Sequence, residues 1–516
     1  MRLGTIVART KAGIVTAKVQ RKFDAIRPAG AELLHEGFQS GLILRGRRVV
    51  PELHAGAREQ ARRARCGDAD FEAGERTPEQ VQITVVEDHR NAECYCCLRF
   101  RYHRAMVTAD SQDRSTRRRS FGPGLLVTAA FVGPGTIATA SAAGADFAYG
   151  LAWALLFSVV ATIVLQEMSV RQAIVSDSGL APTLRRALGS GWTGRFTILL
   201  VVLAIGVGNA AYESGNIAGA ALALDGALPG GNSLWALVIG GVATGLLFLP
   251  AYRQLEVVLI AMVLLMSAVF VLSALLLGPD WQALLRGVTH PTIPAGSLTM
   301  VIALIGTTVV PYNLFLQANA ARDHWADDPD RPAALRAARL DTFGSVILGG
   351  LITLAIISAA AITFYGRSGA FSPDALGQQL EPVLGPAGPL VFAAGLFAAG
   401  LTSAVTAPLA AAYAVCGALG FEDRMQGRAF RTVAVAVVLT GTVFAATGGR
   451  PLSLIVFAQA ANGLLLPFVA VLLLWLMNQR KLLGNAVNRW PSNLLGGAVV
   501  LVALALSGHK ILSLLP

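Results

Sequence analysis

Charged residues are scarce in most of this 516-residue chain: they make up 14% of it, whereas 54% of the residues are hydrophobic. Residues 121–516 hold 19 basic and 16 acidic side chains, and the shorter segment 1–120 holds 23 and 15. The net charge of +11 therefore comes mostly from the first segment and gives no argument for nucleic-acid binding by the rest. This composition is typical of a membrane protein that crosses the bilayer several times.

Cysteines and nucleotide-binding motifs are also scarce. Four of the five cysteines (Cys66, Cys94, Cys96 and Cys97) lie in the first segment and only Cys416 lies beyond it, so no disulfide framework follows. The chain has no GxxxxGK[ST] phosphate loop, which disfavours an ATP-driven pump. We expect neither enzymatic activity nor a bound cofactor.

Residues 1–120 form a basic segment that lacks a regular pattern. Its start has no basic stretch followed by an apolar one, so it is not a secretory signal. Two interpretations stay open: a disordered cytosolic tail, or a gene start assigned too early, with the protein beginning near Met106. Cys94-Tyr95-Cys96-Cys97 with His89 and His103 offers ligands for a soft metal, but the spacing is not that of a zinc site.

From Phe121 onward, apolar runs long enough to cross a bilayer follow one another. The sequence predicts an all-α membrane domain over residues 121–515 with eleven spans, at 121–145, 147–170, 195–224, 233–251, 255–278, 297–321, 341–365, 387–417, 430–447, 452–478 and 493–514.

The connections between spans differ in their basic residues. Those after spans 1, 3, 5, 7 and 9 contain only Arg286, Arg367 and Arg450. The others hold Arg171, Arg185, Arg186, Arg195, Arg253, Arg322, Arg331, Arg336, Arg339, Arg424, Arg428, Arg480, Lys481 and Arg489. Because basic loops stay on the cytoplasmic side, we expect a cytoplasmic N-terminus, an external C-terminus and a location in the cell (plasma or inner) membrane.

Two of these runs are interrupted at their centres. Gly133-Pro134-Gly135 breaks the first and Val310-Pro311-Tyr312-Asn313 breaks the sixth, since proline lacks the N–H of a helical residue and clashes with the preceding turn. Either break alone could be an ordinary proline kink. Two interrupted segments at corresponding positions of two halves indicate a transporter substrate site, because freed backbone groups at that depth must line a cavity.

Spans 1–5 (121–278) and 6–10 (297–478) then form two halves. With five crossings in each half, the second is inverted relative to the first, and each opens with its broken helix. This is the LeuT-like inverted repeat, to which the helix at 493–514 is an addition.

Motifs within residues 120–515 resemble the natural resistance-associated macrophage protein (NRAMP) family of metal-ion transporters. The matching residues of the first two spans are Gly122-Pro123-Gly124, Pro134-Gly135, Gly144-Ala145, Phe147, Tyr149, Leu165-Gln166, Arg171 and Leu180-Ala181. Those of the sixth and tenth spans are Gly306, Thr308, Pro311, Asn313, Leu314, Leu316, Gln459 and Leu466-Pro467-Phe468. The resemblance implies a secondary transporter of divalent cations such as Mn²⁺, Fe²⁺ or Mg²⁺ that works by alternating access.

The ion-binding positions depart from that family. Its first break reads Asp-Pro-Gly-Asn, where this chain has Gly133-Pro134-Gly135-Thr136; its sixth span reads Met-Pro-His-Asn, where this chain has Val310-Pro311-Tyr312-Asn313. Gly133 offers no charge to a dehydrated divalent ion, and Val310 offers no thioether to a soft metal. The seven histidines lie in the first segment, in a loop or among the final residues, so no imidazole is expected to relay protons across these helices.

The remaining candidates form a neutral, hydrogen-bonding site. Its predicted members are Val132, Gly133, Thr136, Thr307 (or Thr308), Val310, Tyr312, Asn313, Gln459 and Asn462, beside the helix-breaking Pro134, Gly135 and Pro311. Of these, Thr136 and Gln459 align with substrate-site positions of the family. The alternative for each hydroxyl or amide is a hydrogen bond between helices.

One acidic residue, Glu213, lies midway along the third span. Burial in a membrane disfavours its charged form, which makes it a candidate proton carrier, and it aligns with an acid of the family's proton route. Asn216 takes the place of the next acid of that route. The alternative is a structural carboxyl. Glu167 and Arg171, four residues apart, are interpreted as a structural ion pair.

Three functions remain open for the chain, with the bilayer and a small solute as its partners. The first is transport of a cation, such as Mg²⁺, that keeps part of its water shell. The second is transport of a small organic acid or other solute, held at the N-termini of the half-helices. The third is a member that does not transport and acts as a sensor or scaffold.

Overall fold

The computed structural model describes residues 132–248, 252–325, 328–367, 371–421, 427–447 and 449–512, together with five strands of the N-terminal segment. The chain divides into two compact units, Met1–Ser120 and Phe121–Pro516. The proposed gene start at Met106, and Gly122-Pro123-Gly124 of the second unit, lie outside the described residues, as do His89 and His103 of the predicted metal cluster, whereas Cys94-Tyr95-Cys96-Cys97 lies in a described strand.

The strands of the first unit pair antiparallel in the order β1-β2-β3-β4-β5. They are β1 (Gly4–Thr10), β2 (Gly13–Val19), β3 (Ala69–Ala73), β4 (Val81–Asp88) and β5 (Glu93–Leu98). Gly4 pairs with Val19, and Asp88 pairs with Glu93. The sequence analysis did not predict these strands, although Val81-Gln82-Ile83-Thr84-Val85 in β4 alternates apolar and polar side chains.

The second unit is all-α over the residues described. Its main helices are α5 (Pro134–Phe147), α6 (Ala152–Ser176), α8 (Trp192–Asp225), α9 (Asn232–Leu246), α10 (Tyr252–Leu277), α12 (Leu298–Thr308), α13 (Pro311–Trp325), α14 (Arg331–Phe364), α16 (Gly388–Leu419), α17 (Arg428–Thr447), α18 (Pro451–Leu476) and α20 (Trp490–Leu512). Every predicted span therefore carries helix, with α12 and α13 sharing the sixth. Within the described ranges, nine helical stretches are long and apolar enough to cross a membrane, and α9 is a shorter apolar helix.

The connections contain helices that the sequence analysis did not include. They are α7 (Leu180–Leu188), α11 (Trp281–Thr289), α15 (Glu381–Leu384), α19 (Arg480–Leu483) and the 3₁₀ turns η2 (Pro373–Leu380), η3 (Gly385–Ala387) and η4 (Gly484–Ala486). The largest boundary error is at α14, which begins ten residues before the predicted 341, after a side-chain cap by Asp330. Likewise, His324, which was expected in a loop, lies in the last helical turn of α13, and His509 lies in the last helical turn of α20.

Contacts between helices follow the inverted repeat. The first span's α5 packs on α14, the seventh span, and the sixth span's α13 packs correspondingly on α6, the second. In the same way, the third span's α8 packs on the tenth span's α18, and the eighth span's α16 packs correspondingly on the fifth span's α10. The helices α8 and α16, which belong to different halves, also pack on each other. The all-α, LeuT-like plan predicted from the sequence is thus confirmed.

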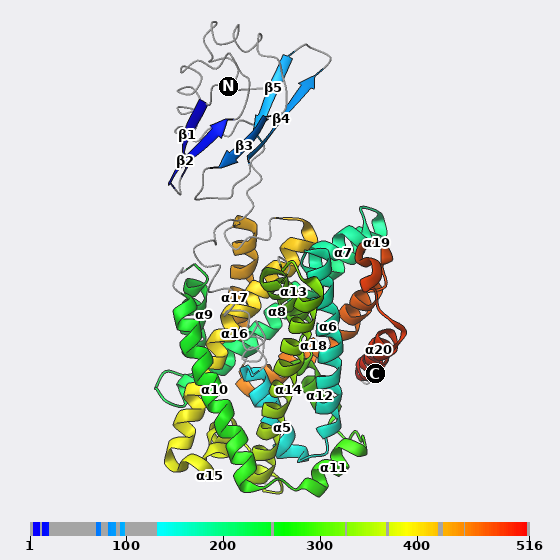
Figure 1. The fold of residues 1–516 in the computed structure, drawn as a ribbon. Helices are drawn as coiled ribbons and strands as arrows, with labels where there is room; N and C mark the ends of the chain where they lie inside the picture. The colour runs from blue at the N-terminus through cyan, green and yellow to red at the C-terminus, as the bar shows by residue number, and fades with distance from the viewer. Residues whose placement is uncertain are drawn as a thin grey trace. The chain divides into compact units, whose positions relative to one another are not determined.

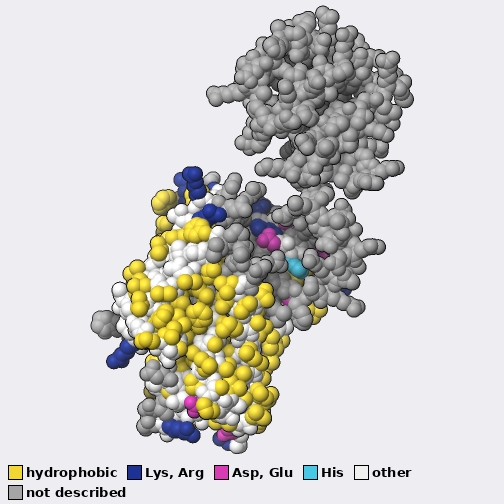
Figure 2. Space-filling model, turned by 90° about the vertical axis from the view of Figure 1, so that its left-hand side faces the viewer, with side chains coloured by type: hydrophobic (Ala, Val, Ile, Leu, Met, Phe, Trp, Pro, Cys, Tyr) yellow, Lys and Arg dark blue, Asp and Glu magenta, His cyan; other side chains and the backbone are white. Residues whose placement is uncertain are grey.

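The two ends of the helical unit carry different connections. In Figure 1, α7 and α19 lie at one end and α11 and α15 at the other, as expected if successive helices cross a bilayer. Between the ends, Figure 2 shows a band of hydrophobic side chains on the surface, with Lys and Arg gathered at its two margins. Exposed large apolar residues such as Leu265, Leu275 and Phe457 are suited to lipid contact.

Candidate functional site

The described part of the first break lies at the start of α5. Gly133 is the N-cap in an extended conformation, Pro134 and Gly135 open the helix, and no side chain caps its first turn. Proline is favoured at this position because its fixed φ suits a helix and its missing N–H would be unbonded in any case. Val132 and Gly133 are buried although they lie outside any helix.

The second break separates α12 from α13. Val309 ends α12, its N–H bonding the Ile305 carbonyl, and α13 begins two residues later at Pro311. Val310 lies between them and is 2% exposed. The second predicted interruption is therefore present, and at the first the described residues show a helix that starts at Pro134, so in both places proline starts the helix that follows.

The two breaks meet at α18. Thr136 Oγ1 of α5 lies 2.8 Å from Thr307 Oγ1 of α12, within hydrogen-bond distance. A Cβ added at Gly135 would overlap the amide nitrogen of Gln459 on α18, and one added at Gly306 would overlap the Gln459 backbone carbonyl. Glycine at both positions thus permits three helices to converge. We call Gly135, Thr136, Thr307 and Gln459 the junction.

Buried amides at and beside the junction lack hydrogen-bond partners. Within the described part of the chain, neither Oε1 nor Nε2 of Gln459 and neither Oδ1 nor Nδ2 of Asn313 has one, and Asn462 Nδ2 is also unpaired. These three side chains are at most 2% exposed. Buried polar atoms are normally hydrogen-bonded, so such a group indicates a place for a polar ligand or ordered water.

Tyr312 fills the space beside Asn313. Its ring lies edge-on to Tyr212 of α8, with the ring centroids 5.1 Å apart. Both tyrosines are buried, at 2% and 1% exposed. The position at which the family has histidine therefore holds an aromatic pair that connects α13 to α8.

The predicted proton residues, Glu213 and Asn216, lie on α8. Glu213 of α8 is fully buried and accepts a hydrogen bond of 3.2 Å from Asn216 Nδ2, while its Oε1 has no partner among the residues described. Its side chain packs against Gly441 of α17, where an added Cβ would crowd Glu213 Cγ. Glu213 and Asn216 are therefore joined by a hydrogen bond, and the Glu213 side chain packs toward α17.

Glu167 and Arg171 belong to a larger network than the predicted ion pair. Arg171 Nε lies 3.0 Å from Glu167 Oε1, and Arg339 of α14 binds the same carboxylate oxygen at 2.7 Å. Arg171 also donates to the Ala486 carbonyl and to Asn488 Oδ1, at 2.6 and 2.7 Å. The network joins α6, α14 and the connection before α20, which supports the structural interpretation.

Gln166 is a candidate that the sequence analysis did not include in the site. Thr162 and Ser169 of α6 bond the carbonyls of Thr308 and Leu314, so this face of α6 lies along the second break. Gln166 is between them on the same face and is 1% exposed, and its Oε1 has no partner within the described ranges. The spacing of Thr162, Gln166 and Ser169, four and then three residues, was a signal available in the sequence.

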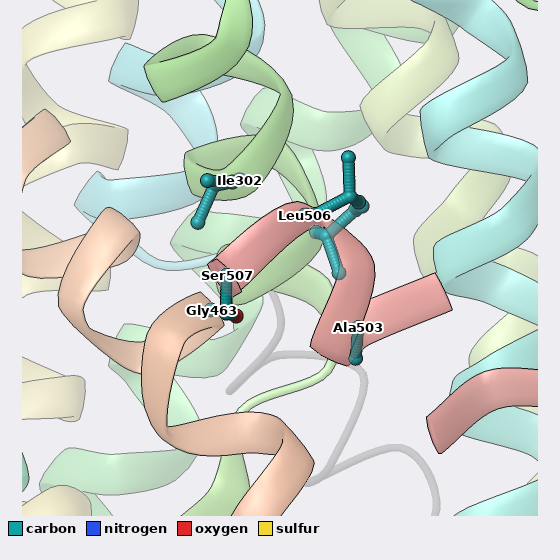
Figure 3. A pocket seen from close by; sticks show the side chains of 6 residues that line it. Ile302, Gly463, Ala503, Leu506 and Ser507 are labelled. Atoms are coloured by element: carbon teal, nitrogen blue, oxygen red, sulfur yellow. The ribbon is translucent and has the colours of Figure 1, made fainter. Parts of the chain in front are cut away.

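A recess elsewhere in the unit has a lining that is unsuited to a polar substrate. Figure 3 shows it between α12, α18 and α20, with a lining that is apolar except for the Ser507 hydroxyl. It contains none of the predicted substrate residues. Among the residues that the structure describes, no three His, Cys, Asp or Glu side chains cluster as metal ligands. The junction with Asn313 therefore remains the candidate site, and its donors are neutral.

Comparison with known proteins gives consistent matches over the helical unit. Residues 124–513 match the family model "Natural resistance-associated macrophage protein-like". The chain is similar to the divalent metal cation transporter MntH of Xylella fastidiosa, 31% identical over 404 residues that cover 75% of this chain and 84% of that protein. It is also similar to MntH of Deinococcus radiodurans, 28% identical over 401 residues, or 76% and 89% of the two chains.

A solved structure shows the same fold. The Eremococcus coleocola manganese transporter, crystallised with an aromatic bis-isothiourea compound, aligns with a TM-score of 0.64 at 22% identity, over 78% of this chain and 88% of that one. Together with the family match over most of the chain, this agrees with the resemblance carried by the sequence motifs. The chain belongs to the natural resistance-associated macrophage protein-like family of membrane transporters.

Proposed function

We propose that this protein is a secondary transporter that carries a divalent cation, with part of its water shell retained, through a site at the junction. The observation that supports this most is the set of unpartnered amides on Gln459 and Asn313, among the described residues, at the point where two broken helices meet. The similarity to proteins named divalent metal cation transporters supports the substrate class.

The neutral donors favour a hydrated ion over a dehydrated one. A divalent cation stripped of water needs anionic ligands, and Gly133 stands where the family has its carboxylate. Mg²⁺ gives up water reluctantly and is commonly bound through retained waters, which donate hydrogen bonds. The amide oxygens of Gln459 and Asn313 and the hydroxyls of Thr136 and Thr307 can accept them. Val310 offers no soft ligand, which disfavours selectivity for transition metals.

Alternating access would follow from rocking one helix group against the other. The half-helices α5 and α13 pack on α14 and α6, so these elements form one group around the breaks. The helices α8, α16 and α17 pack on one another and form the second. The junction lies at the contact between α5, α12 and α18, where relative movement would open it to one side at a time.

Glu213 is the proposed carrier of a coupled proton. It has an unpartnered carboxyl oxygen, judged over the described residues, and its neighbour Tyr212 contacts Tyr312 beside the second break. We expect Glu213→Gln to uncouple proton entry from cation uptake, whereas Asn216→Ser, which keeps a polar neighbour for Glu213, should preserve the coupling. Unchanged proton entry in Glu213→Gln, recorded by an internal pH dye, would assign Glu213 a structural role.

A small organic acid is the second candidate, favoured by a different feature. Neither α5 nor α13 has an acidic residue in its first turn, and no side chain caps α5. Uncapped N–H groups at helix starts attract anions, and the amide NH₂ groups of Gln459 and Asn313 are further donors. This is the arrangement that would hold a substrate carboxylate.

The membrane orientation is part of the proposal. The connections that contain α7 and α19 lie at one end of the unit (Figure 1) and include Arg185, Arg186, Arg480 and Lys481, whereas those that contain α11 and α15, at the other end, include only Arg286 and Arg367. We place that end in the cytoplasm of a cell membrane, with the C-terminus outside.

Uptake by the full chain reconstituted in liposomes tests the substrate. We expect saturable Mg²⁺ uptake with weaker Mn²⁺ uptake, both abolished by Gly133→Trp, because an indole would fill the space in front of α5. The matched control is Gly344→Trp on α14, where an added Cβ meets open space. Flux of an organic anion, with no flux of either metal through folded protein, would favour the second candidate.

A further inference from the structure

The connection between α18 and α20 is a rigid basic surface. Asn488 N–H bonds the Met477 carbonyl at 2.9 Å, and the side chains of Asn478 and Asn493 bond each other in both directions at 2.9 Å. From α6, Arg171 holds Ala486 and Asn488. The backbone is therefore fixed from two sides.

Basic side chains of this connection point outward. Arg480, Lys481 and Arg489 are exposed, as is Trp490, at 75%. None of the three cations forms an ion pair with a residue that the structure describes, and residues 424–516 contain eight basic side chains and no Asp or Glu. We call Arg480, Lys481, Arg489 and Trp490 the basic platform.

Apolar surface adjoins the platform on the side of the bilayer. Trp475, in the last turn of α18, is 38% exposed, and Trp490 begins α20, whose Leu494 and Leu495 are 61% and 48% exposed. Tryptophan is typical of the headgroup level, where its ring lies between water and hydrocarbon. Figure 1 shows α19 at one end of the helical unit beside α20, so charges at the margin adjoin a helix suited to acyl chains.

We propose that the basic platform binds the headgroup of an anionic glycerophospholipid of the bilayer. Arg480, Lys481 and Arg489 supply the charge that a phosphate diester with an anionic or strongly polar headgroup requires, and the exposed face of α20 receives its chains. Because Arg and Lys near a membrane surface attract anionic lipid, such a lipid is preferred over a zwitterionic one of the same chain length. The site is independent of the transported substrate.

Fluorescence quenching of Trp490 by brominated lipid measures which lipid lies at the basic platform. The full chain is placed in phosphatidylcholine vesicles that contain, at equal mole fraction, either brominated phosphatidylglycerol or brominated phosphatidylcholine, since bromine quenches a nearby indole. The chain has seven tryptophans, so the signal of Trp490 is the difference between the wild type and Trp490→Phe. We expect brominated phosphatidylglycerol to quench Trp490 more strongly, and the difference to shrink as salt is added.

Two triple variants with the same charge change separate the platform from a general surface effect. In Arg480→Gln/Lys481→Gln/Arg489→Gln the preference should be lost, because each basic residue contributes a factor of about five in affinity for anionic lipid. In Arg286→Gln/Arg367→Gln/Arg450→Gln, which removes three exposed arginines from the other connections, it should remain. Equal quenching by both lipids in the wild type, or the same loss in both triple variants, would overturn the proposal.

Discussion

Two fully buried glutamines of this protein have opposite surroundings. The side-chain amide of Gln379, in η2, accepts a hydrogen bond from Ser141 Oγ at 3.1 Å and donates one to the Leu376 backbone carbonyl at 2.9 Å. The backbone carbonyl of Gln379 accepts a hydrogen bond from Ser273 Oγ. Gln459, at the junction, has no partner for either amide atom among the residues described. An amide without partners costs stability, by about 1–3 kcal/mol, so the first glutamine stabilises the fold and the second does not.

The charged groups extend this comparison. Arg171 and Arg339 both bind Glu167, which is one residue along α6 from Gln166, whose Oε1 has no partner among the described residues. Ions in a membrane protein must be paired or reach water, whereas a neutral amide can remain unpaired at a lower cost. Unpartnered buried atoms also occur elsewhere in the described chain, but only Gln459 and Asn313 have two each, and both residues lie at the helix breaks.

Replacing each glutamine by leucine gives the largest expected effect. Gln459→Leu should lower Mg²⁺ uptake by about 10- to 100-fold, the value of one or two lost hydrogen bonds to a charged substrate, without lowering the unfolding temperature. Gln379→Leu should leave uptake per folded molecule unchanged and reduce stability by about 1–3 kcal/mol, because Ser141 and the Leu376 carbonyl lose their partner. Uptake assays and thermal unfolding in detergent measure both quantities.

The reverse outcome would contradict the assignment of Gln379 to stability and Gln459 to transport. If Gln459→Leu unfolded the protein while Gln379→Leu abolished uptake, the unpartnered amide would be structural and the hydrogen-bonded one functional. A fall in both quantities for both variants would show that burial alone, and not hydrogen bonding, determines the effect.

A smaller effect is expected at Gly135, which brings the Gln459 amide to the junction. An added Cβ would overlap Nε2, and because this is the end of a flexible side chain, the amide should shift. We expect Gly135→Ala to weaken Mg²⁺ binding about fivefold, the value of about one hydrogen bond. Gly344→Ala, on an open face of α14, is the control.

A double variant tests whether the overlap is the cause. In Gln459→Ala the amide is absent, so the further change Gly135→Ala should have no additional effect on uptake. Additive losses would show that Gly135 acts in another way, for example by allowing the backbone conformation of the helix break.

Much of the fold was predictable from the sequence because a bilayer allows few solutions. Apolar runs about 20 residues long had to be helices, and Gly133-Pro134-Gly135 and Val309-Val310-Pro311 had to interrupt them. Helix ends were less predictable: α14 begins at Arg331, where polar residues extend beyond the apolar run, and α7 and α11 are too short for that criterion.

The convergence of some candidate residues was predictable from the sequence, and the direction and pairing of others were less so. Thr136, Thr307 and Gln459 were expected to converge, and the structure brings them together. The direction in which a side chain leaves its helix depends on packing, however, so the orientation of Glu213 toward α17 could not be read from its position in the third span. The pairing of Glu167 with Arg339 also required the tertiary structure, since 172 residues separate them.

The smallest expected effects lie in the charged network, where the two ion pairs of Glu167 should differ. Arg171 is 7% exposed and Arg339 is 40% exposed. Glu167→Gln leaves the buried Arg171 without a carboxylate and should cost about 2 kcal/mol of stability, less than the loss expected for a fully buried pair. Arg339→Gln removes a pair open to water and should cost less than about 1 kcal/mol, decreasing as salt is added. Denaturant unfolding of both variants measures this difference.

Equal losses of stability in the two variants would mean that Arg339 positions α14 through more than its charge. A larger loss for Arg339→Gln would show that the carboxylate mainly secures the seventh span, since Arg171 keeps its bonds to Ala486 and Asn488 in either case.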